Sequence, residues 1–513
     1  MLTKTYGSAI YGVDAITITV ETSVELGVNF LMVGLPDSAV KESQQRIESA
    51  LSQNGFRFPG KKIVINMAPA DIRKEGSAYD LTLAIGILAA SEQIKNDHVG
   101  DYILMGELSL DGGLRPIKGA LPIAIESLRQ GFKGIILPKE NAEEAAIVSS
   151  LKVYGANHIL DVIRFFNGEE NLQPTEINAR KEFQYSGVKY AWDFSDVRGQ
   201  ENLKRALEIT AAGGHNVILI GPPGSGKTML AKRMPSILPP MTLHEALETT
   251  KIHSVAGKLG RQRGLVSARP FRAPHHTISD VALVGGGSIP QPGEISLAHN
   301  GVLFLDEMPE FKRQVLEVLR QPMEDRIVSI SRARMSIDYP ASFMLVAAMN
   351  PCPCGNYNHP WKPCTCAQGI VAKYLNKISG PLLDRMDLHV EVTPVDENIL
   401  NSPKSVESSA NIRERVIAAR QKQEERFAED TDIHCNAQMT PQHLVEYCQL
   451  NETCRNILKQ AMQKLGLTAR AYDRILKVSR TIADLEDSAD IQIHHLSEAI
   501  HFRSLDRENW GKN

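Results

Sequence analysis

Apolar residues in the middle of the chain gather in short runs that glycines and polar residues interrupt. The runs at 216–220, 301–305 and 343–349 are apolar at nearly every position. Strands that a parallel sheet buries on both faces have this composition and length. Helix-compatible stretches lie between the runs. The pattern therefore predicts an α/β domain with a parallel sheet over residues 191–395.

The N-terminal 165 residues show a second α/β pattern. Apolar and β-branched residues predict strands, bounded by turn residues, in four places: 16–20, 30–33, 63–67 and 134–138. The apolar stretch 81–90 has the length of a buried helix. At 513 residues the chain is long enough for several domains, and we expect one over residues 1–165.

The remaining stretches are polar or helical. Residues 166–190 are polar and predict a linker. Residues 396–513 predict helices, among them 411–427, 470–484 and 493–502. We therefore expect an N-terminal α/β domain, a linker, an α/β core and a C-terminal helical domain.

A glycine-rich loop directly follows the first apolar run. Residues 221–228 fit G-x-x-x-x-G-K-[ST] between a strand and a helical stretch, the context that a phosphate-binding loop requires. Backbone N–H groups and a helix N-terminus bind phosphate in such loops. Lys227 is expected to reach the β- and γ-phosphates of ATP, and Thr228 to bind Mg²⁺. The expected nucleotide contacts are Gly221, Pro222, Pro223, Gly224, Ser225, Gly226, Lys227 and Thr228.

Two acidic residues end the second run, Asp306 and Glu307. They follow a predicted buried strand, and ligands of open α/β sheets bind at the carboxyl ends of the strands. Asp306 is expected to hold Mg²⁺, and Glu307 to polarise the attacking water. The sequence therefore predicts hydrolysis of ATP as well as binding.

The charge distribution allows a nucleic-acid surface only as a local patch, because the formal net charge is −3. No acidic residue occurs from Lys251 to Ser279, where six are basic: Lys251, Lys258, Arg261, Arg263, Arg269 and Arg272. Alternating residues at 326–337 predict a β-hairpin with Arg332 and Arg334 near its tip. Arg272, Arg332 and Arg334 are candidate DNA contacts. A solvated basic face or a contact between ring subunits is the alternative.

No apolar run approaches the about 20 residues of a membrane span, and the N-terminus lacks a signal-peptide core. We therefore expect a cytoplasmic protein without membrane contact.

Four of the seven cysteines lie within residues 352–366. In a reducing compartment such a cluster of cysteines indicates structural Zn²⁺, with free thiols or a stress disulfide as alternatives. The expected ligands are Cys352, Cys354, Cys364 and Cys366, with His359 in reserve.

Four N-terminal motifs resemble a Lon-protease-type domain, of the ribosomal-S5-domain-2-like fold: 76–78, 106–112, 115–119 and 137–141. That family cuts peptides with a serine–lysine dyad, and Ser77 falls at the nucleophile. Leu121 occupies the place of the lysine, and Lys118 comes three residues too early. A serine without a base is a poor nucleophile. The resemblance implies an inactive domain kept for binding or assembly, and a serine peptidase is the alternative.

Three further residues resemble AAA+ ATPase positions. Asn350 follows the third run as sensor 1 does, Arg385 resembles an arginine finger, and Arg470 resembles sensor 2. The glycine-rich segment before Asp306 and the hairpin at 326–337 resemble two insertions. They are the helix-2 insert and the pre-sensor-1 hairpin of the clade with magnesium chelatase subunits and minichromosome-maintenance helicases. His275 and His276, in the first insertion, are expected to pack in a loop or against a neighbouring subunit rather than to bind metal.

With the Lon-like domain, three long motifs resemble the bacterial YifB/ComM family of Mg-chelatase-like AAA+ ATPases: 271–277, 292–307 and 380–388. The resemblance implies an ATP-dependent DNA motor, a homohexameric ring with a helical lid that acts in recombination or natural transformation on single-stranded or branched DNA. The alternative is a chelatase-type or protein-remodelling ATPase with a protein partner. Stimulation of ATP hydrolysis by DNA distinguishes the two.

Overall fold

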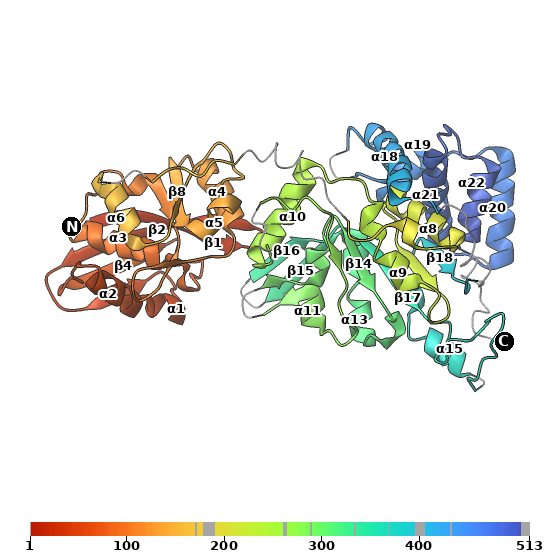
Figure 1. Ribbon diagram of the computed structural model, residues 1–513, viewed down its shortest axis with the longest axis horizontal. Coiled ribbons are helices and arrows are strands. Elements are labelled where there is room, and N and C mark those ends of the chain that lie inside the picture. The colour runs from red at the N-terminus through yellow and green to blue at the C-terminus, as the bar shows by residue number, and fades with distance from the viewer. Residues whose placement is uncertain are drawn as a thin grey trace. The chain divides into compact units, whose positions relative to one another are not determined.

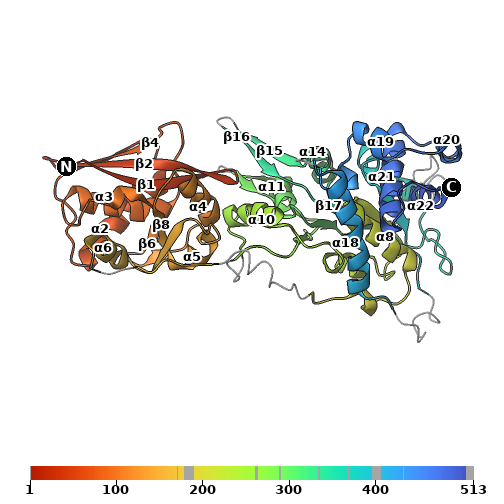
Figure 2. The same cartoon turned by 90° about the horizontal axis from the view of Figure 1, so that it is seen from above.

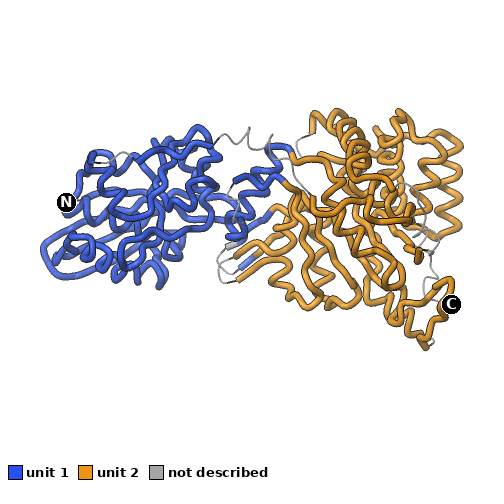
Figure 3. Tube along the Cα trace, viewed as in Figure 1, with its two compact units in different colours: residues 1–187, 242–267, 331–339 blue, residues 188–241, 268–330, 340–513 orange. Residues whose placement is uncertain are grey.

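The computed structural model describes residues 2–169, 172–177, 190–259, 264–287, 290–332, 335–367, 369–395, 406–430 and 433–503. The chain divides into two compact units (Figure 3). Unit 1 comprises residues 1–187, 242–267 and 331–339, and unit 2 comprises residues 188–241, 268–330 and 340–513. The middle of the chain thus contributes two segments to the N-terminal unit, which the sequence pattern does not predict.

Unit 1 is built on a mixed seven-stranded sheet in the order β3-β4-β2-β1-β5-β8-β9. Its strands are β1 (Leu2–Tyr11), β2 (Asp14–Glu25), β3 (Phe30–Val33), β4 (Lys62–Ala68), β5 (Tyr102–Leu104), β8 (Gly134–Pro138) and β9 (Lys152–Ala156). β1, β2 and β4 pair antiparallel, and the other neighbours pair parallel. The four strands expected from the sequence are β2, β3, β4 and β8.

Helices cover one side of the β1–β2–β4 part of this sheet (Figure 2). The N-terminal helices of unit 1 are α1 (Ser38–Lys41), α2 (Ser43–Gln53), α3 (Asp80–Ala90), α4 (Ala120–Arg129), α5 (Lys139–Ala145) and α6 (Ile159–Asn167). Of these, α3 and α4 contact β1 and β2, whereas α5 and α6 contact β9. Every residue of α3 is buried, so the apolar stretch at 81–90 is a core helix. A short antiparallel ribbon is formed by β6 (Glu107–Leu108) and β7 (Leu114–Arg115).

Unit 2 contains the parallel sheet that the central apolar runs predict, in the order β11-β14-β17-β10-β18. Its strands are β11 (Phe271–Arg272), β14 (Val302–Leu305), β17 (Met344–Met349), β10 (Val217–Ile220) and β18 (Leu388–Glu391). All neighbours are parallel, and every residue of β10, β14 and β17 is buried. The carboxyl ends of these three strands therefore lie at one edge, where the nucleotide motifs follow.

The chain between residues 201 and 383 forms further helices and short strands (Figure 1), of which the helix at residues 243–255 belongs to unit 1. They include α8 (Glu201–Gly213), α9 (Lys227–Ala231), α10 (Leu243–Val255), α11 (Asp280–Val284), β12 (Gly285–Gly286), β13 (Gln291–Pro292), α12 (Glu294–Leu297), α13 (Arg313–Glu317), α14 (Arg320–Asp325), α15 (Ile370–Leu375) and α16 (Gly380–Leu383). The predicted hairpin is formed by β15 (Ile327–Arg332) and β16 (Met335–Pro340).

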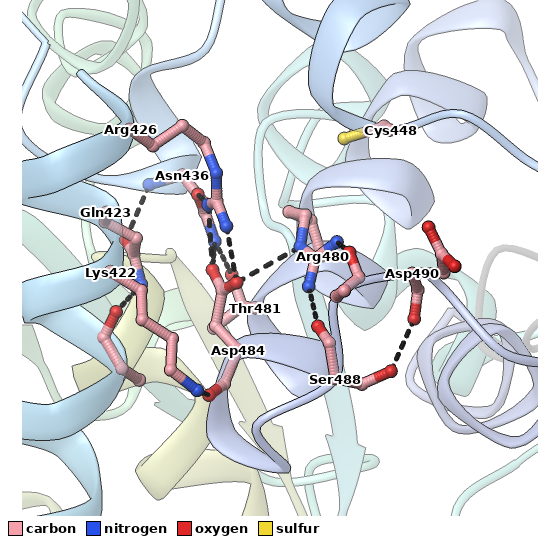
Figure 4. Close-up of polar contacts among 12 residues, drawn as sticks. Lys422, Gln423, Arg426, Asn436, Cys448, Arg480, Thr481, Asp484, Ser488 and Asp490 are labelled. Carbon is pink, nitrogen blue, oxygen red and sulfur yellow. Dashed lines mark hydrogen bonds and ion pairs between the residues drawn. The ribbon is translucent and has the colours of Figure 1, made fainter.

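The C-terminal region of unit 2 is helical, as the sequence predicts. Its helices are α18 (Ser409–Arg426), α19 (Pro441–Tyr447), α20 (Glu452–Leu465), α21 (Ala469–Leu485) and α22 (Ile493–His501). Asp484 of α21 is 2% exposed. It accepts hydrogen bonds from Arg426 of α18 at 2.6 and 2.9 Å and from Arg480 at 3.1 Å (Figure 4). The pair of Arg426 and Asp484 ties α18 to α21, and Arg480 adds a second cation from within α21.

Candidate nucleotide-binding and hydrolysis site

The glycine-rich loop connects β10 to α9, with Lys227 as the first residue of the helix. Gly224 and Gly226 adopt φ angles of +76° and +90°, which only glycine tolerates readily. A side chain at Gly221 would place its Cβ 2.2 Å from the carbonyl oxygen of Val392, so this position also requires glycine. The loop therefore has the glycine-dependent backbone that a phosphate cradle requires.

The Lys227 ammonium is buried inside this loop. Its Nζ donates to the carbonyl oxygens of Gly221 at 2.7 Å and Pro222 at 2.8 Å. Burial lowers the pKa of Lys227 to about 8, and the charge of Asp306 opposes that shift. Nζ also lies 3.4 Å from Oδ1 of Asn350, the residue after β17. The structure thus brings together two residues that the sequence places in the site separately.

Thr228 and Asp306 meet across the sheet edge. Thr228 Oγ1 donates to Asp306 Oδ2 at 2.8 Å, and Asp306 Oδ1 accepts from the backbone N–H of Glu307 at 3.0 Å. A hydroxyl and a carboxylate are the oxygen ligands that Mg²⁺ prefers beside phosphates. The donor set at the ends of β10 and β14 therefore fits the magnesium ion of a nucleotide complex.

Glu307 follows in a left-handed conformation, with φ +52° and ψ +46°. Non-glycine residues adopt this region rarely and mostly where function demands it. Its side chain is 59% exposed, and its Oε2 lies 3.8 Å from Nδ1 of His276. His276 follows β11, the strand next to β14, and its ring stands edge-on to Phe311. We expected loop or subunit packing for His276, and no local signal reveals its contact with Glu307.

Arg385 and Arg470 occupy different surroundings. The Arg385 side chain is 10% exposed and binds Glu324 of α14 at 2.7 Å, and it donates to the carbonyl oxygen of Pro381 at 2.7 Å. Arg470 lies exposed in the first turn of α21. These two contacts of Arg385 involve α14 and α16 and no residue of the phosphate loop. Its role as an arginine finger and the sensor role of Arg470 stay predictions.

Arg474, one helical turn after Arg470, makes the contact that the sequence analysis missed. Its Nη1 lies 2.8 Å from Oδ1 of Asp387, which is fully buried. The same carboxylate accepts from the backbone N–H of Asn216, the residue before β10, at 2.8 Å. Burial alone would raise the pKa of Asp387, but Arg474 and His215 hold it well below the ordinary range. Asp387 therefore joins helix α21 to the strand that carries the phosphate loop.

The four clustered cysteines lie next to Asn350. The Sγ of Cys352 is 3.3 Å from that of Cys354 and 3.8 Å from that of Cys364, and all four sulfur atoms, including that of Cys366, lie within 4.8 Å of one another. Sulfur atoms at about 2.3 Å from a tetrahedral Zn²⁺ are about 3.8 Å apart, whereas a disulfide needs about 2 Å. The thiols therefore fit zinc. His359 instead accepts hydrogen bonds from the backbone of its own loop.

The candidate DNA contacts differ in their surroundings. Arg272 binds Glu294 through two hydrogen bonds of 2.6 and 2.7 Å, whereas Arg332 is exposed on β15. Arg334, Arg261 and Arg263 lie outside the described residues. Lys251 pairs with Asp14 at 3.2 Å, and Arg269 donates to backbone carbonyls of three residues: Pro239, Pro240 and Asn300. Much of the basic run is thus engaged within the chain.

In unit 1, Ser77 donates a hydrogen bond to the carboxylate of Glu107. Leu121, at the place of the Lon lysine, is fully buried beside Ile147. The structure thus gives Ser77 a carboxylate as its partner, and it places an apolar side chain where the dyad has an amine.

No helix of the described residues is both long and apolar enough to cross a bilayer.

Comparison with known proteins agrees with these motifs. Three family profiles match consecutive parts of the chain: subunit ChlI of Mg-chelatase at residues 20–141, magnesium chelatase subunit ChlI at 193–400, and its C-terminal part at 406–503. The magnesium-chelatase 38 kDa subunit of Cereibacter sphaeroides is 24% identical over 244 residues, which are 44% of this chain and 63% of that protein.

Two relatives match almost the whole length. Competence protein ComM of Haemophilus influenzae is 46% identical over 506 residues, 98% of this chain and 97% of that protein. The uncharacterised protein YifB of Escherichia coli K12 is 46% identical over 506 residues, 97% and 96% of the two chains. The chain therefore belongs to the ComM/YifB family of magnesium-chelatase ChlI-like proteins, whose members are AAA-type ATPases.

Proposed function

We propose that the protein is an ATP-driven DNA motor that works as a homohexameric ring in the cytoplasm, in DNA recombination or natural transformation. The observation that carries the ATPase part is the convergence of Lys227, Thr228, Asp306, Glu307 and Asn350 at one edge of the parallel sheet. Similarity to competence protein ComM of H. influenzae over 98% of this chain supports the DNA part.

In this proposal each residue at the sheet edge has one task in hydrolysis. Lys227 moves from the loop carbonyls to the β- and γ-phosphates, where its charge stabilises the transferring phosphoryl group. Thr228 and Asp306 would hold Mg²⁺, which neutralises phosphate charge when bound. Glu307 accepts the proton of the attacking water, and Asn350 orients that water. Arg385 of one subunit would complete the site of the next after leaving Glu324, with Arg470 acting from the lid.

The N-terminal unit is, in this proposal, a Lon-like domain that does not cut peptides. Leu121 supplies no base for Ser77, and an unactivated serine hydroxyl is a weak nucleophile. The four thiols bind one structural Zn²⁺, which fixes the loop that follows Asn350. Gly355 of that loop approaches Pro223 so closely that an added Cβ would lie 2.5 Å from its Cδ. A fixed cysteine loop would therefore support the phosphate loop.

One observation favours a second function, a chelatase-type or protein-remodelling ATPase with a protein partner. Arg272 pairs with Glu294, and Lys251 pairs with Asp14, so neither is presented as a free cation. The family profiles of magnesium chelatase match the same core. Basic residues with partners in their own chain contribute less to phosphate binding, because each pair must open first.

The test is ATP hydrolysis by the purified protein with and without single-stranded and forked DNA, with the Glu307→Gln variant as the blank. The DNA-motor proposal requires hydrolysis that DNA accelerates and that higher salt weakens through counterion release. Robust hydrolysis that ignores both DNA forms would contradict it and favour a protein substrate.

A further inference from the structure

Two later segments of the chain belong to the N-terminal unit. Residues 242–267, which include α10, and residues 331–339 of the β15–β16 hairpin cluster with residues 1–187 (Figure 3). Both segments leave unit 2 and return to it. The first overlaps the basic run at 251–279, and the second includes part of the hairpin expected at 326–337, where the sequence analysis places candidate DNA contacts. Their attachment to unit 1 therefore needs an explanation in terms of function.

Polar contacts fix the C-terminal half of α10 to unit 1. Glu144 of α5 is 6% exposed, and its Oε1 accepts hydrogen bonds from the backbone N–H of Leu121 at 2.8 Å and from the Ser254 hydroxyl of α10. The backbone N–H of Gly119 donates to the carbonyl oxygen of Ser254 at 3.3 Å. A buried carboxylate needs such donors, so α10 and the start of α4 share one acceptor.

Apolar contacts cover the same face. Leu121 and Ile147 form a small core, separate from the main core of unit 1, against which Leu247 and Leu265 pack. Leu121 stands where a Lon-type dyad has its lysine. A charged amine there would have to lose its hydration beneath α10, at a cost that leucine avoids. The position that holds the lysine in a Lon-type dyad is therefore part of the surface against which α10 packs in this chain.

The turn between β1 and β2 contacts both segments. The Tyr11 hydroxyl donates to the carbonyl oxygen of Ser336 in β16 at 3.2 Å. Three residues later, Asp14 binds Lys251 of α10 at 3.2 Å. Between them, a Cβ on Gly12 would lie 3.0 Å from Ile337, so the turn and the hairpin approach closely. One short turn thus connects the helix and the hairpin.

We propose that the N-terminal domain is an anchor that holds α10 and the β15–β16 hairpin in the geometry through which DNA accelerates ATP hydrolysis. This function rests on the proposed DNA motor. The segment 242–267 leads directly into β11 and His276, which contacts Glu307. A displacement of α10 on the domain therefore reaches the catalytic carboxylate through continuous chain. The domain thereby couples DNA binding to ATP hydrolysis. Loss of this coupling leaves the nucleotide site itself intact.

Two variants of the full-length protein loosen the anchor in different ways. Leu247→Asp places a charge in the small core, and Asp14→Lys places a second cation opposite Lys251. The Asp14 side chain is 71% exposed, so that substitution leaves the fold intact. His244→Ala, at a side chain of α10 that is 80% exposed, is the matched control. Each protein is assayed for ATP hydrolysis with and without forked DNA, at low and moderate salt.

We expect basal hydrolysis within about twofold of the parent in all three variants. Stimulation by DNA should fall about tenfold in Leu247→Asp, the size of a typical coupling between sites. Stimulation by DNA should fall less in Asp14→Lys than in Leu247→Asp. The fall in Asp14→Lys should be larger at low salt than at moderate salt, because salt screens exposed charges. His244→Ala should match the parent.

The outcomes distinguish failure of the anchor proposal from failure of the DNA-motor proposal. A parent that DNA stimulates, with both anchor variants stimulated equally, overturns the anchor and leaves the motor standing. A parent that DNA does not stimulate overturns the motor and with it the anchor. If Leu247→Asp loses basal hydrolysis through misfolding, the Asp14→Lys result decides: full stimulation at low salt overturns the anchor, and reduced stimulation supports it.

Discussion

ATP binding should weaken as the pH rises through 8, because Lys227 must be protonated to bind phosphate. Burial lowers the pKa of the Lys227 ammonium to about 8 in the free protein. The negative polyphosphate favours the charged lysine, so bound ATP raises that pKa. Affinity is therefore nearly full below about pH 7 and is lost progressively as the pH rises through 8.

The expected size follows from the pKa of the free protein. With a pKa of about 8, about three in four Lys227 side chains are protonated near pH 7.5 and about one in eleven near pH 9. The dissociation constant of Mg-ATP should therefore rise about eightfold over this interval, which corresponds to about 1.3 kcal/mol. Calorimetric titration of the Glu307→Gln variant at constant ionic strength measures it without turnover.

The Lys227→Arg variant is the control, because a guanidinium keeps its charge beyond pH 12. Its affinity, even if lower throughout, should change little over the same interval. A dissociation constant that stays flat in the lysine protein would refute the reasoning. So would an equal fall in the arginine variant, since another group would then be titrating.

Three further predictions concern residues around the site and in the lid. His276→Ala should lower kcat of ATP hydrolysis about tenfold with little change in KM, because Glu307 loses a side chain that orients it. His276→Gln should restore part of the rate. A kcat of His276→Ala equal to that of the parent protein would argue against this contact. Asp484→Ala should destabilise the helical region by about 3–5 kcal/mol, since two buried guanidinium groups lose their carboxylate, and an unchanged urea midpoint would contradict it. Elemental analysis of the purified protein should find about one zinc per chain, and much less in the Cys364→Ser variant. The Cys448→Ser variant, changed in the helical region, should keep the metal. Purified parent protein without zinc would refute the zinc site.

Local pattern was sufficient for the sheets and the nucleotide motifs. The runs at 217–220, 302–305 and 344–349 are strands because residues buried on both faces are apolar at every position. The phosphate loop and the acids after β14 occupy fixed offsets from those strands, so the sequence alone predicts that Thr228 and Asp306 lie at one edge of the sheet, where the structure joins them by a hydrogen bond. By contrast, β1 was missed because its first buried positions hold the polar residues Thr3 and Thr5, so its buried face is not apolar in sequence.

The contacts that sequence reasoning missed join residues far apart in the chain. Asp387 and Arg474 are separated by 87 positions, and Asp14 and Lys251 by 237. Neither pair carries a local signature, since an isolated arginine or aspartate is usually a surface residue. The packing of α10 on unit 1 was not predicted for the same reason. Leu121 appeared in the sequence only as a missing lysine, and its apolar role became visible once α10 was placed.

The most direct test of the central claim is a single-turnover experiment on the Glu307→Gln variant. The account predicts that this variant retains bound ATP in the presence of Mg²⁺ and releases almost no phosphate, because the glutamine cannot accept the proton of the attacking water. The Lys227→Ala variant, run beside it, should fail to retain ATP. Phosphate release by Glu307→Gln at the rate of the parent protein would contradict the assignment of the site.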